Sequence, residues 1–166
     1  MAIKIWGNSI LLGNNGIAAA DACCCVTGCP ATESECTDCG DRTVTVSGWT
    51  GDCSRGNGSY TVSPTWNAPE ESCVYYGNDV VESGVDACGG MAWSSDYIDI
   101  TIYCEDGLWY VQIYGSSWTP DCDVDFDWTS EGRAGDCPPT GAYNMVTDGL
   151  ADSGGSDCPA PTVSLS

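Results

Sequence analysis

The stretch that decides the fold is Tyr97–Tyr114, YIDITIYCEDGLWYVQIY, in which two alternating runs meet at Asp106-Gly107. Asp-Gly between such runs is the strongest short-range signal for a two-residue β-hairpin, because a type I′ turn needs positive φ at both central positions. This loop predicts a register in which Cys104 lies opposite Trp109. A slip of one residue would mix the two faces of the hairpin, so the register is well specified.

The two faces of this predicted hairpin differ in character. One face is apolar and is expected in a protein core: Ile100, Ile102, Cys104, Trp109, Val111 and Ile113. The other face is polar and rich in tyrosine: Asp99, Thr101, Tyr103, Tyr110, Gln112 and Tyr114. Such a division is typical of an antiparallel sheet with one buried and one open side. It predicts the fold class without naming a function.

Further short alternating runs predict more strands, separated by turn residues. A chain of 166 residues with 21 glycines supports one turn-rich domain of ordinary size plus a tail. The spacing predicts an all-β, disulfide-stapled antiparallel β-sandwich of roughly seven to nine strands, immunoglobulin-like or jelly-roll-like. The predicted strands outside the hairpin cover residues 43–47, 59–63, 73–76, 124–129, 143–146 and 161–166.

The chain divides into three predicted parts: an extended N-terminal assembly segment (1–22), a cysteine-rich knot (23–40) and the β-sandwich domain (41–166). The first part begins with an apolar run that is followed by the glycine-rich patch 13–16. A strand in that position can dock on a neighbouring subunit by strand addition, or it can be an ordinary first strand of the same sheet. The predicted docking residues are Ile3, Ile5, Trp6, Ile10 and Leu12.

Net charge excludes whole classes of partner. The chain has 24 acidic residues against four basic ones, which gives a formal charge of −20. Nucleic acid is excluded as a partner because phosphate binding needs a basic surface. An anionic membrane surface is disfavoured for the same reason. Cations, neutral glycans and other proteins remain as partner classes, and solubility alone also accounts for the charge.

Histidine is absent from the chain. This rules out Ser-His-Asp and Cys-His catalysis within the chain, as well as histidine-ligated zinc. Any catalysis would have to rely on carboxylates, tyrosines or thiolates. Paired carboxylates such as Glu70-Glu71, or Asp96 with Asp99, could serve a glycosidase. With so many acidic residues, neighbouring carboxylates arise by coincidence, so the chain is predicted not to be an enzyme.

Thirteen cysteines are an unusually high density for this length and predict disulfides formed in an oxidising environment. The part from residue 41 onward holds an odd number of them, so it must form at least one bond to the 23–40 knot or keep a free thiol. The connectivity cannot be read from the sequence. The disulfide candidates are Cys23, Cys24, Cys25, Cys29, Cys36, Cys39, Cys53, Cys73, Cys88, Cys104, Cys122, Cys137 and Cys158.

The N-terminus does not have the pattern of an export signal. Its apolar run Ile10–Leu12 is broken at once by residues 13–16, so it has no continuous hydrophobic region. No stretch is long enough to span a membrane. Many cysteines without an export signal fit a protein that is made in a cytosol and oxidised after release by lysis, as virion components are. A chain whose signal has been removed is the competing explanation.

Two metal sites are conceivable. Cys25-x3-Cys29 and Cys36-x2-Cys39 resemble a four-thiolate zinc site, although the pairs are closer than in the usual zinc ribbon; disulfides are favoured over it because the rest of the chain is also rich in cysteine. Alternation in residues 121–128 also places a row of carboxylates on one face of a strand, where oxygen ligands would favour Ca²⁺. An acidic outer face opposite a buried stripe is the favoured interpretation of this row. The candidate calcium ligands are Asp121, Asp123, Asp125 and Asp127.

The tyrosine-rich side of the hairpin suggests a binding surface. Tyr103, Tyr110 and Tyr114, with Trp118 just beyond them, resemble the aromatic platforms on which sugar rings stack. The same residue types are common in protein interfaces, and cross-strand Tyr103–Tyr110 pairing also stabilises a sheet. A subunit interface or plain sheet stabilisation is therefore favoured over glycan binding.

Residues 3–25, IKIWGNSILLGNNGIAAADACCC, precede a turn-rich β region that closes on CPAPTVSLS at residues 158–166. This layout resembles small cysteine-rich proteins of unknown function from tailed phages and planctomycete-type bacteria, some of which are regarded as virion accessory or fibre components. The resemblance covers the N-terminal segment and the general layout and transfers no functional residues. It implies a structural or adhesion role on a particle surface.

Together these observations predict a non-enzymatic structural protein of an extracellular assembly, most specifically a decoration, tail or fibre-associated component of a phage virion. Its expected partners are other subunits of the same assembly, including copies of itself. A glycan-binding adhesion module with a calcium site is the first alternative, and a small zinc-knot protein is the second. No cofactor is expected beyond the candidate calcium ion.

Overall fold

The structure is a computed structural model that describes residues 28–77, 97–119, 122–151 and 155–166, apart from the side chains at 52, 55, 97, 117–119, 122 and 123. It also gives the backbone of four short N-terminal strands. Strand β1 (Ile3–Ile5) pairs with β2 (Asn8–Ile10), and β3 (Leu12–Gly13) pairs with β4 (Gly16–Ile17). Each pair is a sheet of its own, separate from the main sheet. The side chains of the docking residues lie outside the described residues, so their docking stays a prediction.

The predicted hairpin is confirmed. Strands β8 (Tyr97–Glu105) and β9 (Leu108–Thr119) are antiparallel, with Cys104 opposite Trp109 as the loop requires. Asp106 and Gly107 have φ of 51° and 78°, both positive, as a type I′ turn demands. On the apolar face, Ile100, Ile102, Trp109, Val111 and Ile113 are all fully buried.

Ten strands form one antiparallel sheet whose order is β12-β14-β5-β6-β7-β8-β9-β10-β13, with β11 paired to β9. Six consecutive strands, β5 to β10, form a meander in which each strand pairs with the next. Immunoglobulin and jelly-roll folds use Greek-key connections, so this run follows a simpler path. Besides β8 and β9, the strands are β5 (Arg42–Ser47), β6 (Gly58–Asn67), β7 (Ser72–Gly77), β10 (Cys122–Ser130), β11 (Arg133–Ala134), β12 (Gly141–Tyr143), β13 (Met145–Asp148) and β14 (Thr162–Leu165).

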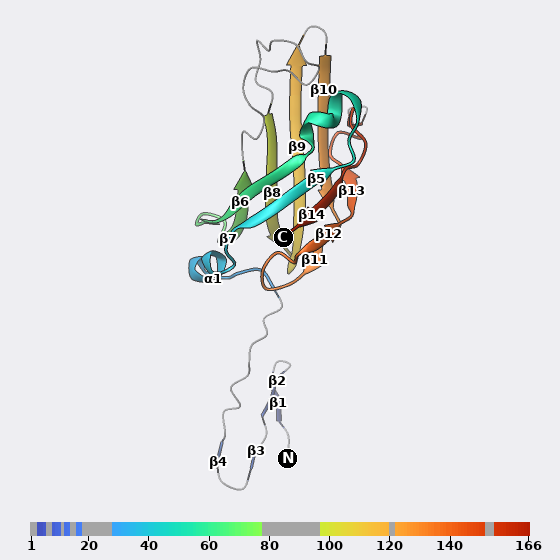
Figure 1. Cartoon of the computed structure of the whole chain (residues 1–166). Helices are drawn as coiled ribbons and strands as arrows, with labels where there is room; N and C mark the ends of the chain where they lie inside the picture. The colour runs from blue at the N-terminus through green and yellow to red at the C-terminus, as the bar shows by residue number, and fades with distance from the viewer. Residues whose placement is uncertain are drawn as a thin grey trace.

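The sheet folds over on itself along β6. The first half of this long strand, Gly58–Val62, pairs with β5, whereas the second half, Ser63–Asn67, pairs with β7. Figure 1 shows the result: β5 and β6 lie across β8, β9 and β10. The far ends of the sheet also approach each other, because β12 pairs with β14 and β13 pairs with β10 while only Asn144 separates them. The all-β, disulfide-stapled class is therefore confirmed, in a nearly closed sheet.

The core fills the space between the two halves of the folded sheet. Val44, Val46, Val163 and Leu165 come from β5 and β14, and they face the apolar side of β8–β10. Each lies on the side that strand alternation predicts. Trp49 and Phe126 join the halves, with ring centroids 4.7 Å apart. The Trp49 ring lies so close to Gly56 that a Cβ there would be 2.2 Å from it, which explains the glycine.

A short helix, α1 (Glu33–Asp38), lies at one end of the sheet. Its N-cap is Thr32, whose hydroxyl accepts a hydrogen bond from the Glu35 backbone N–H at 3.3 Å. The Glu35 side chain in turn accepts from the Ala31 N–H at 2.8 Å, one residue before the N-cap, so the bond is close to that of a capping box but is shifted by one residue. The sequence carries a Thr-x-x-Glu signal for this helix at Thr32 and Glu35, inside the segment predicted to be a cysteine-rich knot.

Four disulfides join described residues of the domain. They join Cys29 to Cys104, Cys36 to Cys73, Cys39 to Cys137, and Cys53 to Cys158. The first three run from the 23–40 segment to distant parts of the β region, which is the first of the two alternatives that the odd cysteine count left open. Cys53 lies in a 3-10 turn, η1 (Gly51–Gly56). Disulfides of this density belong to an oxidising, extracellular setting. The sulfurs of Cys23, Cys24, Cys25, Cys88 and Cys122 lie outside the described residues.

No helix in the described part of the chain is long and apolar enough to cross a membrane.

Tyr75 offers a test of how the core is packed. Its ring is fully buried, yet its hydroxyl has no hydrogen-bond partner among the described residues. A buried hydroxyl without a partner costs free energy, so Tyr75→Phe should leave the free energy of unfolding unchanged or raise it by up to about 1 kcal/mol. The matched control is Tyr60→Phe, because the buried Tyr60 hydroxyl donates to the Gly56 carbonyl at 2.9 Å. Thermal unfolding of both variants should show a loss of about 1 kcal/mol only for Tyr60→Phe; an equal loss for both would contradict this packing.

Candidate binding face

The outer side of strands β7–β9 carries a row of aromatic rings that we call the tyrosine face: Tyr76, Tyr103, Tyr110 and Tyr114. Tyr76 is 49% exposed, the highest value of any large hydrophobic side chain among the described residues. The other three are partly buried. These residues share a side because they alternate with the buried residues of the same strands. The structure thus brings together the three tyrosines predicted to form a surface and adds Tyr76, while the Trp118 side chain lies outside the described residues.

Two of these rings are occupied by contacts within the domain. Tyr103 and Tyr110 stack at a centroid distance of 5.3 Å with an interplanar angle of 17°. On Tyr110, Gly132 lies so close that a Cβ there would be 2.8 Å from the ring. Because one ring face is taken by Tyr103 and the Gly132 backbone lies against the same ring, Tyr110 stabilises the sheet and the adjoining turn. The most exposed ring of the tyrosine face is therefore Tyr76, which lies beside the side of Tyr103 that does not stack on Tyr110.

Carboxylates surround the tyrosine face. In the strand register, Tyr114 lies between Asp99 of β8 and Asp127 of β10. Burial raises the pKa of the Tyr103 hydroxyl above its usual value, and the negative charge of Glu105 raises it further. Asp127 accepts a hydrogen bond from the Gln112 side-chain amide at 2.9 Å, which fixes its orientation. The face is thus aromatic at its centre and acidic around it, and it repels anions.

The predicted acidic row of β10 has the alternation that the sequence indicates. Val124 and Phe126 are buried in the core, whereas Asp125 and Asp127 lie on the outer side. The loop after β13 then runs along this outer edge. Its Asp157 carboxylate accepts from the Asp125 backbone N–H at 2.8 Å, and its Ser156 hydroxyl accepts from the Asp127 N–H at 3.1 Å.

Asp148 anchors the start of the same loop. Its carboxylate accepts hydrogen bonds from the Leu150 N–H at 2.9 Å and the Ser156 N–H at 2.7 Å, and also from the Ser156 hydroxyl. The Ser156 side-chain and backbone hydrogen bonds lower the pKa of Asp148, in spite of some desolvation. The carboxylates on this side therefore order a loop that covers the edge of β10.

The described residues form neither the predicted zinc site nor the predicted calcium site. No group of three or more cysteine or acidic side chains there is arranged to hold a metal ion. Of the calcium candidates, Asp125 and Asp127 lie on one side of β10, while Asp121 and the side chain of Asp123 are outside the described residues. Of the zinc candidates, Cys29, Cys36 and Cys39 form disulfides with three different partners, so their sulfurs are not thiolates.

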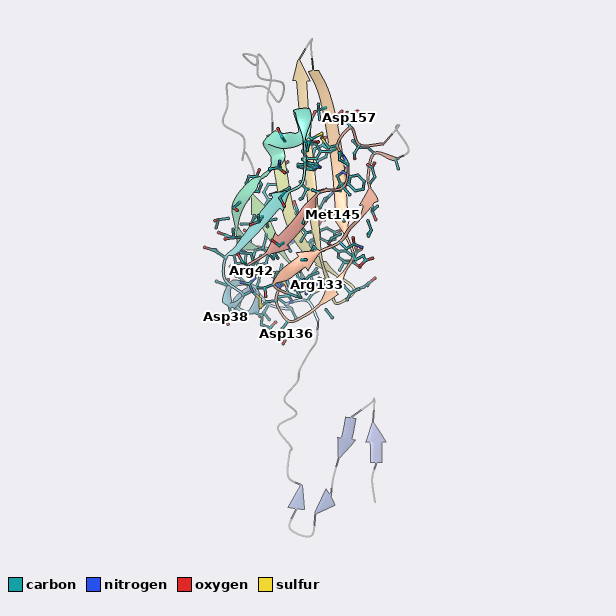
Figure 2. All side chains as sticks on the ribbon, turned by 45° about the vertical axis from the view of Figure 1, so that its right-hand side comes forward. Asp38, Arg42, Arg133, Asp136, Met145 and Asp157 are labelled. Carbon is teal, nitrogen blue, oxygen red and sulfur yellow. A yellow bond between two sulfur atoms is a disulfide. The ribbon has the colours of Figure 1, made fainter. Side chains whose placement is uncertain are left out.

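A hollow of about 390 Å³ lies between α1 and the loop that follows β11. Cys29 and Cys137 in its lining are each disulfide-bonded, to Cys104 and Cys39, so these two walls are covalently joined to other parts of the domain. It is acidic, and Figure 2 shows Asp38 and Asp136 at the same end of the domain. Its lining consists of Gly28, Cys29, Pro30, Ala31, Glu35, Asp38, Asp136 and Cys137.

Both arginines with described side chains support loops and do not form a basic surface. Arg42 donates through Nη1 to the Cys39 carbonyl at 2.7 Å and through Nε to the Pro138 carbonyl at 3.3 Å. Arg133 donates to the Thr140 and Ala142 carbonyls at 3.2 and 3.1 Å. Backbone carbonyls therefore hold both guanidinium groups against the domain.

The sequence reasoning missed a second surface. The outer sides of β5, β6 and β14 carry only hydroxyl side chains over several strand positions. The signal was present in the repeats TVTVS (43–47), SYTVS (59–63) and TVSLS (162–166), where serine and threonine occupy alternate positions. Strand alternation places the valines of these repeats in the core and their hydroxyl residues on the outer side.

Tyrosine ionisation should limit stability at high pH. Burial raises the pKa of the Tyr143 hydroxyl from 10.0 to about 12, against the lowering influence of Arg133 and Arg42. Burial also raises the pKa of Tyr60, Tyr75 and Tyr103. Since the folded state then holds these protons more tightly than the unfolded state, their stabilising contribution is complete below pH 10 and is lost as the pH rises toward 12.

The measurement is the thermal unfolding midpoint of the oxidised protein as the pH is raised from below 10 to about 12. We expect the midpoint to fall through this window, in step with the absorbance of tyrosinate. The Tyr143→Phe variant should lose less stability over the same window, because it has one buried ionisable group fewer. A midpoint independent of pH across the window would contradict these burial-raised pKa values.

No protein-family model, curated protein or solved structure matches this chain. What the protein does has to be inferred from its own residues and their geometry.

Proposed function

We propose that the chain is a non-enzymatic structural protein of an extracellular assembly, specifically a decoration, tail or fibre-associated component of a phage virion. In this role the N-terminal segment docks on a partner subunit and the acidic β domain faces outward. The observation that carries the proposal is the way in which the residues next to the N-terminal segment are fastened to the sheet.

Cys29 is the first described cysteine after the N-terminal segment, and it is bonded to Cys104 at the end of the central hairpin. Ten residues later, Cys39 is bonded to Cys137. Cys36, which lies between Cys29 and Cys39 in the sequence, is bonded to the fully buried Cys73. A force applied through the N-terminal segment therefore passes covalently into three separate parts of the β region. Such fastening is suited to a tether that holds an outward-facing domain on a particle.

The chemistry of the described residues favours a structural role over catalysis. Asp127, Asp148 and Asp157 each accept hydrogen bonds that order the domain itself. The chain has no histidine to act as a general base near neutral pH. Most of the other described carboxylates are exposed, where negative charge serves solubility.

The experiment compares incorporation into particles for the full chain and for a variant that lacks residues 2–12. We expect the deletion to abolish co-sedimentation with particles while the β domain remains folded, as judged by circular dichroism. A sharper pair of variants adds two charges each. Ile3→Asp with Ile5→Asp should also abolish incorporation, whereas Asn14→Asp with Asn15→Asp should not. Unchanged incorporation of the deletion variant would reject the docking role.

The tyrosine face supports a second candidate, a glycan-binding adhesion module. Tyr76 is half exposed beside the open part of Tyr103, and both lie next to polar side chains able to bond sugar hydroxyls. A glycan array with and without a calcium chelator separates the candidates. An adhesion module should bind a defined sugar and lose that binding in Tyr76→Ala, whereas an assembly protein should bind none.

A further inference from the structure

A charge-free surface of this acidic protein lies on the outer side of β5, β6 and β14. We call it the hydroxyl face, and it consists of Thr43, Thr45, Ser59, Thr61, Thr162 and Ser164. These positions alternate with the buried valines and Tyr60 of the same strands, so their side chains point away from the core. Ser59, Thr61 and Thr162 are exposed, and the other three are partly buried.

The strand register makes the hydroxyl face continuous. Thr45 lies opposite Ser59 on one side and Ser164 on the other, and Thr43 lies opposite Thr61. The Thr45 and Ser59 hydroxyls are 3.1 Å apart and share a hydrogen bond. Neighbouring strands are about 4.8 Å apart and alternate residues about 6.7 Å apart, so the hydroxyls form a regular two-dimensional array.

The other outer side of the folded sheet has the opposite character. The outer side of β8–β10 carries Asp99, Glu105, Asp125 and Asp127 around the tyrosine face. Figure 1 shows that β5 and β6 lie across these strands, so the two outer sides belong to opposite surfaces of the domain. With 24 acidic and four basic residues, two copies repel each other when their acidic sides approach.

We propose that the hydroxyl face is a twofold interface at which two copies of this chain pack together. A twofold interface must be complementary to itself, because the same patch is present on both sides. An acidic patch cannot meet that condition, but a hydroxyl patch does, since every serine or threonine hydroxyl both donates and accepts a hydrogen bond. Packing on this face also turns the acidic and tyrosine-bearing sides of both copies outward, away from each other.

This interface goes beyond the proposed function, because it does not involve the N-terminal segment. It also explains why three strands in different parts of the chain keep their outer positions free of charge when one residue in seven of the whole chain is acidic (24 of 166). A solvated sheet surface has no such requirement. The threonine methyl groups add apolar contact between the hydroxyls when the two faces meet.

The test is the concentration dependence of the sedimentation coefficient of the oxidised full chain, at low and high salt. We expect a monomer–dimer equilibrium that high salt strengthens, because salt screens the repulsion between two strongly negative copies. Thr61→Glu should weaken the dimer by about 10-fold or more, since it brings like charges together in the interface. The matched control is Thr65→Glu, which changes an exposed threonine on the same strand where it pairs with β7.

A mixing experiment tests the twofold geometry itself. Thr61→Glu and Thr61→Lys should each be weaker dimers alone, and a mixture of the two should form a heterodimer because the introduced charges compensate across the interface. The variant that lacks residues 2–12 should dimerise like the full chain. Four results would overturn the proposal: a monomer at every concentration in high salt, a dimer that Thr61→Glu does not weaken, a dimer lost with residues 2–12, or a monomer whose hydroxyl face binds a neutral polysaccharide.

Discussion

Reduction of the four disulfides should unfold the β domain at room temperature. The bonded cysteines are separated by 37 to 105 residues along the chain. For loops of this length, the chain-entropy account gives up to about 4–5 kcal/mol for each bond taken alone, although nested loops do not add in full. A domain of this size has a total stability of about 5–15 kcal/mol. The stabilisation lost with all four bonds is therefore as large as the whole free energy of unfolding, or larger.

The measurement is thermal unfolding with and without a thiol reductant, followed by tryptophan fluorescence and near-ultraviolet circular dichroism. We expect the native signal to disappear on reduction and to return on slow reoxidation. A single bond can be tested with Cys36→Ala and Cys73→Ala together, which removes a bond between two buried residues. That variant should lose about 2–5 kcal/mol, or on the order of 10 °C in Tm. A reduced protein with an unchanged Tm would show that the disulfides do not hold the fold.

Trp109→Ala should be the most damaging single substitution in the core. The Trp109 side chain is fully buried and packs edge-to-face on Tyr75, with ring centroids 5.9 Å apart. Its indole N–H donates to the Gly135 carbonyl at 2.9 Å, which fixes the loop after β11 on the central hairpin. Removal of the ring leaves a large cavity and an unpaired carbonyl, so we expect a loss of about 3–5 kcal/mol or failure to fold.

Two further variants keep this prediction measurable. Trp109→Phe retains most of the buried apolar volume and should lose less than Trp109→Ala, so the comparison separates the cavity from the lost hydrogen bond. Tyr76→Ala changes a half-exposed aromatic residue on β7, and it should alter the free energy of unfolding by less than about 0.5 kcal/mol. Equal losses for Trp109→Ala and Tyr76→Ala in denaturant titrations would contradict the core described above.

The central hairpin could be predicted from the sequence because local rules determine it. Asp106-Gly107 specifies the turn, and alternation around it specifies which residues are buried. The same alternation accounts for the burial of Val44, Val46, Val163 and Leu165. Where period two is strong and turn residues are clear, the local pattern and the global fold agree.

Non-local features could not be predicted in the same way. The bending of the sheet along β6 and the approach of β12 to β13 depend on which distant strands pair. The alternation of apolar and polar residues does not specify these pairings. Disulfide connectivity is equally non-local, since many pairings of the same cysteines satisfy the sequence. The helix α1 was local and had a capping-box signal at Thr32 and Glu35, but the surrounding cysteines outweighed it.

The candidate surfaces also differ in whether local sequence is enough to predict them. Tyr103, Tyr110 and Tyr114 could be placed on one side because they belong to one hairpin, and the structure places them there. Tyr76 could not be added without knowing that β7 lies beside β8. The hydroxyl face needed three strands from both ends of the chain to come together, so no single stretch of sequence displays it.

Peptide mapping of the unreduced protein by mass spectrometry tests the central claim, that the cysteines of this chain are structural disulfides and not metal ligands or reactive thiols. We expect linked peptides for Cys29–Cys104, Cys36–Cys73, Cys39–Cys137 and Cys53–Cys158. Native protein in which these eight sulfurs are free, or are released together with stoichiometric zinc, would contradict it.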